Sequence, residues 1–221
     1  MKLLKLSFAI LLLLTITSCV SSLPLNQQFY NTKKVGIILQ VDSIGVAKAG
    51  SQGLLDMALT QGVRFKEPLK KVESNIELTQ PLKNEISYFL NFKNKQFVFI
   101  DEKLDYKALK DFEKPSSDKK YSKKDFRNYK ASHNVDEILY VKVRHGILVS
   151  YYGVIETGKQ GYCNIESEVI DLEDNSLLQK ETLQTMADIK GNWKDGDDYA
   201  NLKEAIQAAI NSSIASLKYK F

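Results

Sequence analysis

Residues 162–187 read YCNIESEVIDLEDNSLLQKETLQTMA and carry the clearest structural pattern in the chain. Tyr162–Leu172 is a long strand pattern rich in apolar and alternating side chains. Glu173–Ser176 (EDNS) is a cluster of turn-forming residues, and Leu177–Ala187 runs back as a second strand. Two strand patterns around a short polar turn predict an antiparallel β-hairpin.

The residues before this hairpin predict further strands of the same sheet. Leu139, Val141 and Val143 alternate with larger or charged residues, which is typical of a half-buried strand. Earlier in the chain, Val35–Val41 (VGIILQV) is an almost continuous apolar run, as expected of a central strand buried on both faces. Gln96–Asp101 (QFVFID) is predicted to be the next strand.

Two segments carry the pattern of helices that pack on this sheet. In Thr79–Leu90, Pro81 suits the first helical position and the apolar residues fall on one face. The chain closes on an amphipathic helix whose apolar residues repeat at helical spacing: Tyr199, Leu202, Ile206, Ile210, Ile214 and Leu217. The order predicts an α/β (α+β) fold: a mixed sheet with an early β-α-β unit, late antiparallel hairpins and a C-terminal amphipathic helix.

Three further segments are interpreted from weaker patterns. Gly45–Gly62 is predicted to be a loop that passes into a short helix. In the most charged part of the chain, a short helix is predicted near Asp105–Phe112. A second helix is predicted to begin at Ser122, with Phe126 and Tyr129 facing inward together.

The N-terminus has the marks of an export signal. Lys2 and Lys5 precede the apolar run Leu6–Leu14, which is too short for a membrane-spanning helix. Ile16–Cys19 (ITSC) resembles a lipobox, the bacterial lipoprotein pattern of aliphatic, small, small, Cys. The resemblance implies that the signal is cut off before Cys19 and that acyl chains are attached there. The alternative is an ordinary signal peptide with an incidental cysteine.

These features divide the chain into three parts. Residues 1–18 are predicted to be a signal peptide that is removed, residues 19–33 the lipidated cysteine and a tether, and residues 34–221 a single α/β domain. Val20 follows the cysteine, where Asp would favour retention at the inner membrane. The expected location is therefore the periplasmic face of the outer membrane, with membrane attachment through Cys19.

Composition and cysteine content exclude several functional classes. Removal of 18 residues leaves 221 − 18 = 203 residues, with 29 basic and 27 acidic side chains, so the mature charge is near +2. This balance predicts no nucleic-acid partner. With Cys19 lipidated, Cys163 stands alone, so neither an intramolecular disulfide nor a cysteine-based metal site is expected. Cys163 is predicted to be a buried, unreactive thiol in a strand.

The sequence predicts no catalytic residue, no metal and no cofactor. His133 and His145 have no paired spacing of the kind that zinc requires. Gly45–Ser51 (GVAKAGS) superficially resembles a phosphate-binding loop, but it lacks a lysine directly after its second glycine. We therefore expect a protein that is not an enzyme.

One basic run is the candidate partner-binding surface. Aromatic residues interleave with its six cations, which are Lys119, Lys120, Lys123, Lys124, Arg127 and Lys130. Such a run could meet an anionic glycan, a phospholipid face or an acidic protein. The competing interpretation is a solvated helix face whose aromatic residues point into the core.

The order of elements resembles one group of envelope lipoproteins. Val135–Val141 (VDEILYV) is similar to a recurring strand entry in the curli secretion lipoprotein, the outer-membrane activator of a penicillin-binding protein and relatives of the TolB N-terminal domain. Ile170–Leu178 (IDLEDNSLL) resembles their hairpin turn, although Asn175 and Ser176 stand where Thr-Gly is usual. The resemblance implies the fold above and an envelope location.

Two functions remain open from the sequence. The first is a non-enzymatic envelope lipoprotein that binds another envelope protein in assembly, secretion or cell-wall maintenance. The alternative is a hydrolase or small-ligand-binding lipoprotein that acts on envelope material. A pocket with titratable groups would favour the alternative, and a patch of exposed aromatic or apolar groups would favour the first. Formation of homo-oligomers is left open.

Overall fold

The computed structural model of the chain describes residues 22–51, 63–102, 104–116 and 118–220. The predicted signal peptide and Cys19 lie outside the described residues. Within the described part, no helix is both long and apolar enough to cross a membrane.

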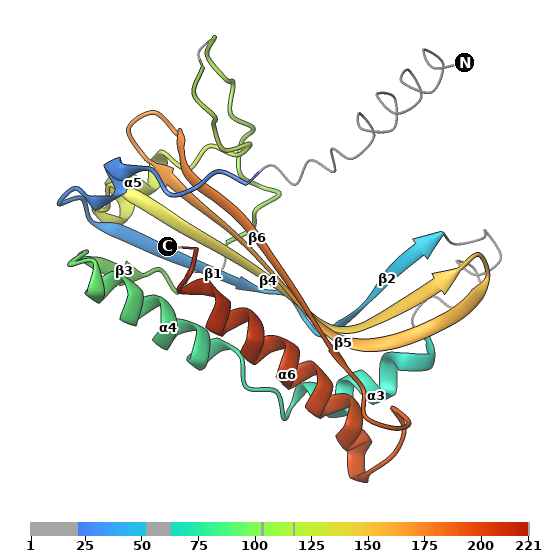
Figure 1. Cartoon of the computed structure of the whole chain (residues 1–221). Helices are drawn as coiled ribbons and strands as arrows, with labels where there is room; N and C mark the ends of the chain where they lie inside the picture. The colour runs from blue at the N-terminus through green and yellow to red at the C-terminus, as the bar shows by residue number, and fades with distance from the viewer. Residues whose placement is uncertain (1–21, 52–62, 103, 117, 221) are drawn as a thin grey trace, which may run out of the picture.

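A six-stranded mixed sheet organises the chain (Figure 1). Strand β1 pairs in parallel with β3 and β4, whereas β4, β5 and β6 pair antiparallel, and β2 lies parallel to the outer half of β4. The predicted mixed sheet, its β-α-β unit and its late hairpin are confirmed. The strands are β1 (Val35–Val41), β2 (Gly45–Ser51), β3 (Phe97–Phe99), β4 (Glu137–Tyr152), β5 (Ile155–Asp171) and β6 (Leu177–Asp188).

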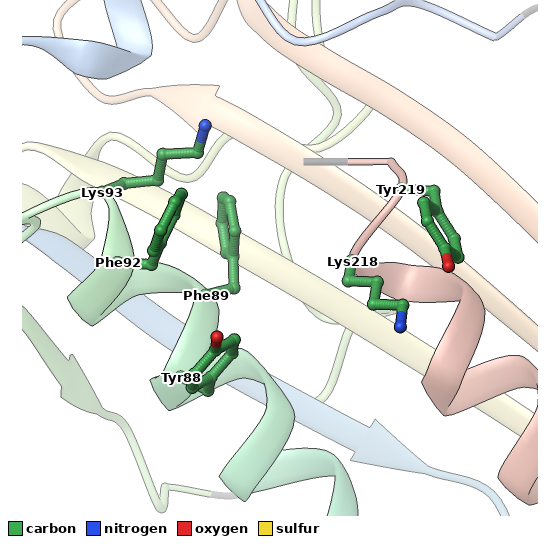
Figure 2. Close-up of a pocket in the computed structure, with 6 residues that line it drawn as sticks. All are labelled: Tyr88, Phe89, Phe92, Lys93, Lys218 and Tyr219. Atoms are coloured by element: carbon green, nitrogen blue, oxygen red, sulfur yellow. The ribbon is translucent and has the colours of Figure 1, made fainter.

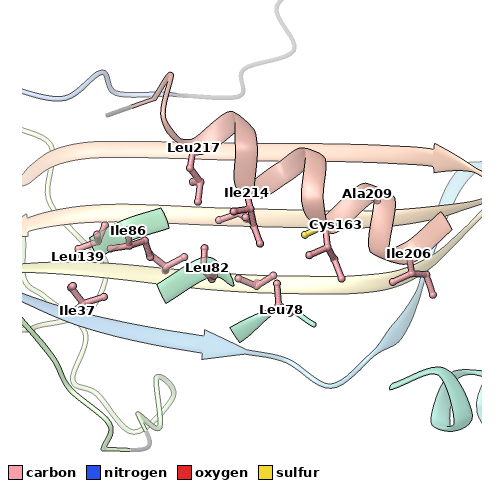
Figure 3. Packing of buried hydrophobic residues seen from close by; sticks show 14 of the residues in the cluster. Ile37, Leu78, Leu82, Ile86, Leu139, Cys163, Ile206, Ala209, Ile214 and Leu217 are labelled. Atoms are coloured by element: carbon pink, nitrogen blue, oxygen red, sulfur yellow. The ribbon is translucent and has the colours of Figure 1, made fainter. Parts of the chain in front are cut away.

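Helices α4 and α6 cover one face of the sheet and close the main core (Figures 1 and 3). Ile206 and Ile210 of α6 are fully buried, as the helical spacing predicts. The backbone of α6 approaches β5 closely, because a Cβ placed on Gly161 would lie 2.3 Å from the carbonyl carbon of Ala205. The helices are α3 (Val63–Glu73), α4 (Thr79–Phe92), α5 (Asn128–His133) and α6 (Ala200–Leu217), with single 3₁₀ turns at Gln27–Tyr30 and Asp197–Tyr199.

The segment predicted as a loop from Gly45 begins instead with strand β2. Gly45 is paired with Gly146 of β4, and Gly146 has a positive φ of 143°. A Cβ on Gly146 would lie 2.0 Å from the Gly45 carbonyl oxygen, so two glycines allow the strands to meet here. The prediction of a loop was wrong because this strand depends on the edge of β4, which is distant in sequence.

The predictions of a helix near Asp105–Phe112 and of a helix that begins at Ser122 were also wrong. Residues 105–112 contain a turn at 106–108 and no helix, and the helix expected from Ser122 begins only at Asn128. The backbone here bonds across the loop instead: Phe112 N–H donates to Lys123 O, and Asp125 N–H to Lys110 O, both at 2.9 Å. The inward orientation of the two aromatic residues is confirmed, with Phe126 fully buried and Tyr129 packed against the same smaller core.

Helix α3 is not among the predicted helices. It contains Pro68, which is disfavoured inside a helix because its ring crowds the preceding turn. Tertiary packing offsets this cost, since Phe65, Leu69 and Val72 are all buried in the main core.

Residues 23–33, here called the N-terminal segment, pack against the domain. Leu23 forms a β-bridge with Lys180 through N–H···O bonds of 2.7 and 2.9 Å, and Asn26 N–H donates to Leu178 O at 2.8 Å. Phe29 is completely buried in the core. The described part of the predicted tether is therefore not a free linker but lies on the domain. Only three residues stand between Cys19 and Leu23, the first residue bridged to the sheet.

Candidate functional site

A buried ion pair holds the N-terminal segment in place. Lys95 follows α4, and its ammonium lies 2.8 Å from Glu137 Oε2 at the start of β4. The same ammonium donates to the carbonyl oxygens of Phe29 (2.5 Å) and Asn31 (3.1 Å) and lies over the Phe29 ring. Burial raises the pKa of Glu137 to about 7, against the opposing effect of Lys95.

The predicted basic run lies in the loop before α5 and in α5 itself, and most of its charge is paired within the molecule. Lys119 contacts Asp174 at 2.7 Å, Lys124 contacts Asp111 at 2.8 Å, Arg127 contacts Asp125 at 2.7 Å and Lys130 contacts Glu173. These carboxylates raise the pKa of Lys119, Arg127 and Lys130.

The two remaining cations of the run are differently placed. Lys120 accepts a backbone hydrogen bond from Leu177, and Lys123 lines a polar pocket on the sheet face opposite α4 and α6. Neither forms an ion pair with another residue that the structure describes. The run is therefore a largely neutralised surface, which weakens its attraction for an acidic partner or an anionic lipid.

A second basic surface, absent from the predictions, lies where α4 and α6 end. It includes a groove of about 320 Å³. Figure 2 shows the aromatic rings and ammonium groups that line the groove, which come from the end of α4, from Lys93 after it and from the two residues that follow α6. The aromatic–lysine surface, as it is called below, consists of Tyr30, Tyr88, Phe92, Lys93, Lys218 and Tyr219. Tyr88, Phe92 and Tyr219 are 67%, 71% and 78% exposed.

The sequence does hold a signal for this surface. Tyr88 and Phe92 are spaced i, i+4 and lie off the buried stripe of α4 that includes Leu82, Ile86 and Phe89. Two aromatic residues on the solvent face of a helix form an exposed apolar patch, and such patches often mark interaction sites.

The tip of the β4–β5 hairpin is a third exposed feature. Tyr152, Val154 and Ile155 surround Gly153 and are 81%, 64% and 65% exposed. The hairpin projects beyond the helices together with β2 (Figure 1). Sequence reasoning missed it because β4 and β5 were predicted shorter than they are. A cluster of three exposed apolar residues is typical of an interaction site.

His133 lies apart from the other two residues, whereas His145 of β4 and Cys163 of β5 are direct cross-strand partners. His133 ends α5, and Asn134 follows it in the left-handed conformation. Cys163 is buried in β5, and burial raises its pKa to about 11, in keeping with the expected unreactive thiol. Among the described residues, no cluster of histidine, cysteine or acidic side chains could hold a metal ion.

His145 is the one of these residues that borders a pocket. It lies in β4 and lines a cavity of about 450 Å³ together with Asp42, Ser43, Glu73 and Thr79. Its Nδ1 atom forms no hydrogen bond with a described residue, and burial lowers its pKa while Glu73 and Asp42 oppose that shift. This pocket therefore combines an imidazole of lowered pKa with two carboxylates.

Comparison with known proteins gives no family. No protein-family model matches the sequence, and no curated protein is significantly similar to it.

Several solved structures align with the chain at low similarity. A PelC dodecamer from Paraburkholderia phytofirmans is 10% identical, with coverage of 80% of this chain and 86% of that chain and a TM-score of 0.27. A neuraminyllactose-binding hemagglutinin homolog from Helicobacter pylori is 10% identical (87% and 84%, TM-score 0.38). Lipoprotein GNA1162 from Neisseria meningitidis is 11% identical (82% and 99%, TM-score 0.32). At these TM-scores the likeness carries no inference about function.

Proposed function

We propose that this protein is a lipid-anchored component of a bacterial envelope that works by binding another envelope protein, without catalysis, through the tip of its β4–β5 hairpin. The observation that carries the proposal is the exposure of Tyr152, Val154 and Ile155 at the end of a long, hydrogen-bonded strand pair. A rigid scaffold that exposes apolar side chains at its end offers a contact surface at little entropic cost.

The envelope location is proposed from the sequence. Ile16–Cys19 matches a lipobox, and two or three acyl chains on Cys19 would hold the protein firmly on a membrane. Val20 favours the periplasmic face of the outer membrane. The protein would then meet its partner in the periplasm, in assembly, secretion or cell-wall maintenance.

Site-specific photo-crosslinking in intact cells tests the binding site. A photoreactive amino acid in place of Tyr152 or Ile155 should give a discrete adduct with one envelope protein, whereas the same group in place of Met186 should not. Met186 is a matched control because it is apolar and 50% exposed on β6. Adducts of equal yield from all three positions would show non-specific contact and defeat the proposed site.

The anchor is tested separately with labelled palmitate. Cys19→Ala should abolish incorporation of the label and leave the protein uncut or soluble. Incorporation by the variant would overturn the proposed anchor, and it would leave the crosslinking result intact because the two measurements are independent.

The pocket beside His145 supports the second candidate, a hydrolase or small-ligand-binding protein. Its volume suits a small molecule, and its titratable groups are the feature expected of such a site. His145→Gln, tested for complementation of a deletion strain, separates the two functions. Full complementation favours protein binding. Loss of function with unchanged stability and membrane attachment would favour chemistry in this pocket.

A further inference from the structure

We propose that the aromatic–lysine surface rests on the anionic phospholipid face of the membrane that holds the anchor. This inference deepens the proposed function and rests on lipidation of Cys19. It assigns an orientation to the domain, with the ends of α4 and α6 toward the bilayer and the β4–β5 hairpin away from it.

The anchor has a short reach. Leu23 is fixed to the sheet by its two hydrogen bonds with Lys180. Four fully extended residues span at most about 14 Å, so an acylated Cys19 must lie within that distance of Leu23. A domain held this closely cannot stand clear of the lipid headgroups, and one of its surfaces has to face them.

The aromatic–lysine surface also lies beside both ends of the N-terminal segment. At the Leu23 end, the Gln179 side chain next to Lys180 donates to Lys220 O at 2.6 Å, which places Tyr219 near the bridge. At the other end, the Lys93 ammonium lies 4.9 Å from the centre of the Tyr30 ring. The segment that leads to the anchor therefore borders both halves of the surface.

The side chains of this surface have the chemistry that suits a phospholipid face. Tyrosine and phenylalanine rings favour the headgroup region of a bilayer, and lysine stems can lie along apolar groups while the ammonium meets phosphate. The Lys93 ammonium lies 5.7 Å from the Phe92 ring, and the Lys218 ammonium lies 4.9 Å from the Tyr219 ring. Among the described residues, no carboxylate lines the groove and neither lysine forms an ion pair.

This orientation also agrees with the proposed binding site. Strand β4 has 16 residues and begins at Glu137, beside the N-terminal segment. At about 3.3 Å per residue it extends up to about 50 Å before Tyr152. The hairpin tip would thus project into the periplasm, toward a partner.

Fluorescence quenching by nitroxide lipids tests the orientation. The full-length lipidated protein is reconstituted in vesicles of phosphatidylethanolamine and phosphatidylglycerol, with a fluorophore on Asn91→Cys, which adjoins Phe92, or on Val154→Cys at the tip. We expect severalfold stronger quenching at position 91 than at position 154. Equal quenching at the two positions would overturn the proposed orientation.

A variant of the surface provides the second test. Tyr88→Ser, Phe92→Ser, Lys93→Gln and Lys218→Gln together should lower quenching at position 91 to the level at position 154, while the protein stays on the vesicles through Cys19. The matched control removes two exposed lysines and one apolar side chain elsewhere, by Lys66→Gln, Lys70→Gln and Met186→Ser, and should leave quenching unchanged. Unchanged quenching in the first variant would contradict the proposal.

Two further outcomes separate a failure of the proposed orientation from a failure of the proposed anchor. Energy transfer between copies labelled at position 91, without lipid quenching, would show that a second copy covers the surface and would overturn the proposal. Failure of the protein to incorporate palmitate would defeat the anchor itself. An anchored protein with an unquenched position 91 would defeat only the orientation.

Discussion

The ammonium of Lys95 lies 2.8 Å from a carboxylate oxygen of Glu137, and both side chains are shielded from solvent. Because the same ammonium binds the carbonyl oxygens of Phe29 and Asn31, this pair joins β4, the end of α4 and the N-terminal segment. Removal of one partner from a buried ion pair leaves an uncompensated charge and is costly.

Lys95→Met should lower the free energy of unfolding by about 3–5 kcal/mol in urea denaturation at pH 8, since Glu137 loses its counter-ion. The variant should also become more sensitive to limited proteolysis within residues 23–33. Lys83→Met is the control, because its ion pair with Asp101 is solvent-exposed and worth under about 1 kcal/mol. Similar losses in both variants would contradict a structural role for Lys95.

The raised pKa of Glu137 predicts a specific pH dependence. Between its unfolded value of about 4.5 and its folded value of about 7, the folded state binds more protons than the unfolded state. The contribution to stability is therefore fully present below about pH 4.5 and is lost as the pH rises through about 7. Relative to Glu137→Gln, the wild-type free energy of unfolding should fall over this window, as measured by urea titrations. A difference independent of pH would refute the shift.

The helix α6 is predicted to be a structural part of the core. Ile206→Asp should lower the free energy of unfolding by several kcal/mol, because the variant loses apolar contact and buries an unpaired charge. Glu204→Asp on the same helix should change it little. Wild-type stability of Ile206→Asp in thermal denaturation would mean that α6 does not pack on the sheet.

The contact between β5 and α6 predicts an effect of a single methyl group. Gly161→Ala should destabilise the protein by about 1–3 kcal/mol, since the added Cβ meets the backbone of Ala205 and α6 must shift. Gly158→Ala is the control, because nothing lies within 4 Å of a Cβ there. Equal denaturation midpoints for the two variants would argue against this close approach.

Cys163 should react slowly with thiol reagents. Burial raises its pKa to about 11, so little thiolate forms near neutral pH and access is blocked. In a Cys19→Ala background, where it is the only thiol, iodoacetamide at pH 8 should modify the native protein far more slowly than the urea-unfolded protein. Equal rates would show that the thiol is exposed.

Local periodicity predicted much of the fold. The β5–β6 hairpin, strand β1 and helices α4 and α6 all follow from side-chain alternation or helical spacing within a single segment. The burial of Ile206 and Ile210 follows in the same way. The candidate surfaces were harder to predict. A single exposed ring such as Phe92 hardly changes the apolar periodicity of its helix, so the sequence pattern alone does not distinguish it from a buried ring.

The sequence by itself determined the mixed α/β class, the order of its main elements and the lipobox-like Ile16–Cys19, since each depends on neighbouring residues alone. The folded structure was needed to show that Gly45–Ser51 is a strand, that remote carboxylates neutralise Lys119 and Lys130 of the basic run, and that residues 23–33 lie on the domain. The physical reason is the same in each case. The hydrogen-bonding or charged partners are more than 40 residues away in sequence for β2, Lys119 and Leu23, so no local pattern can specify them.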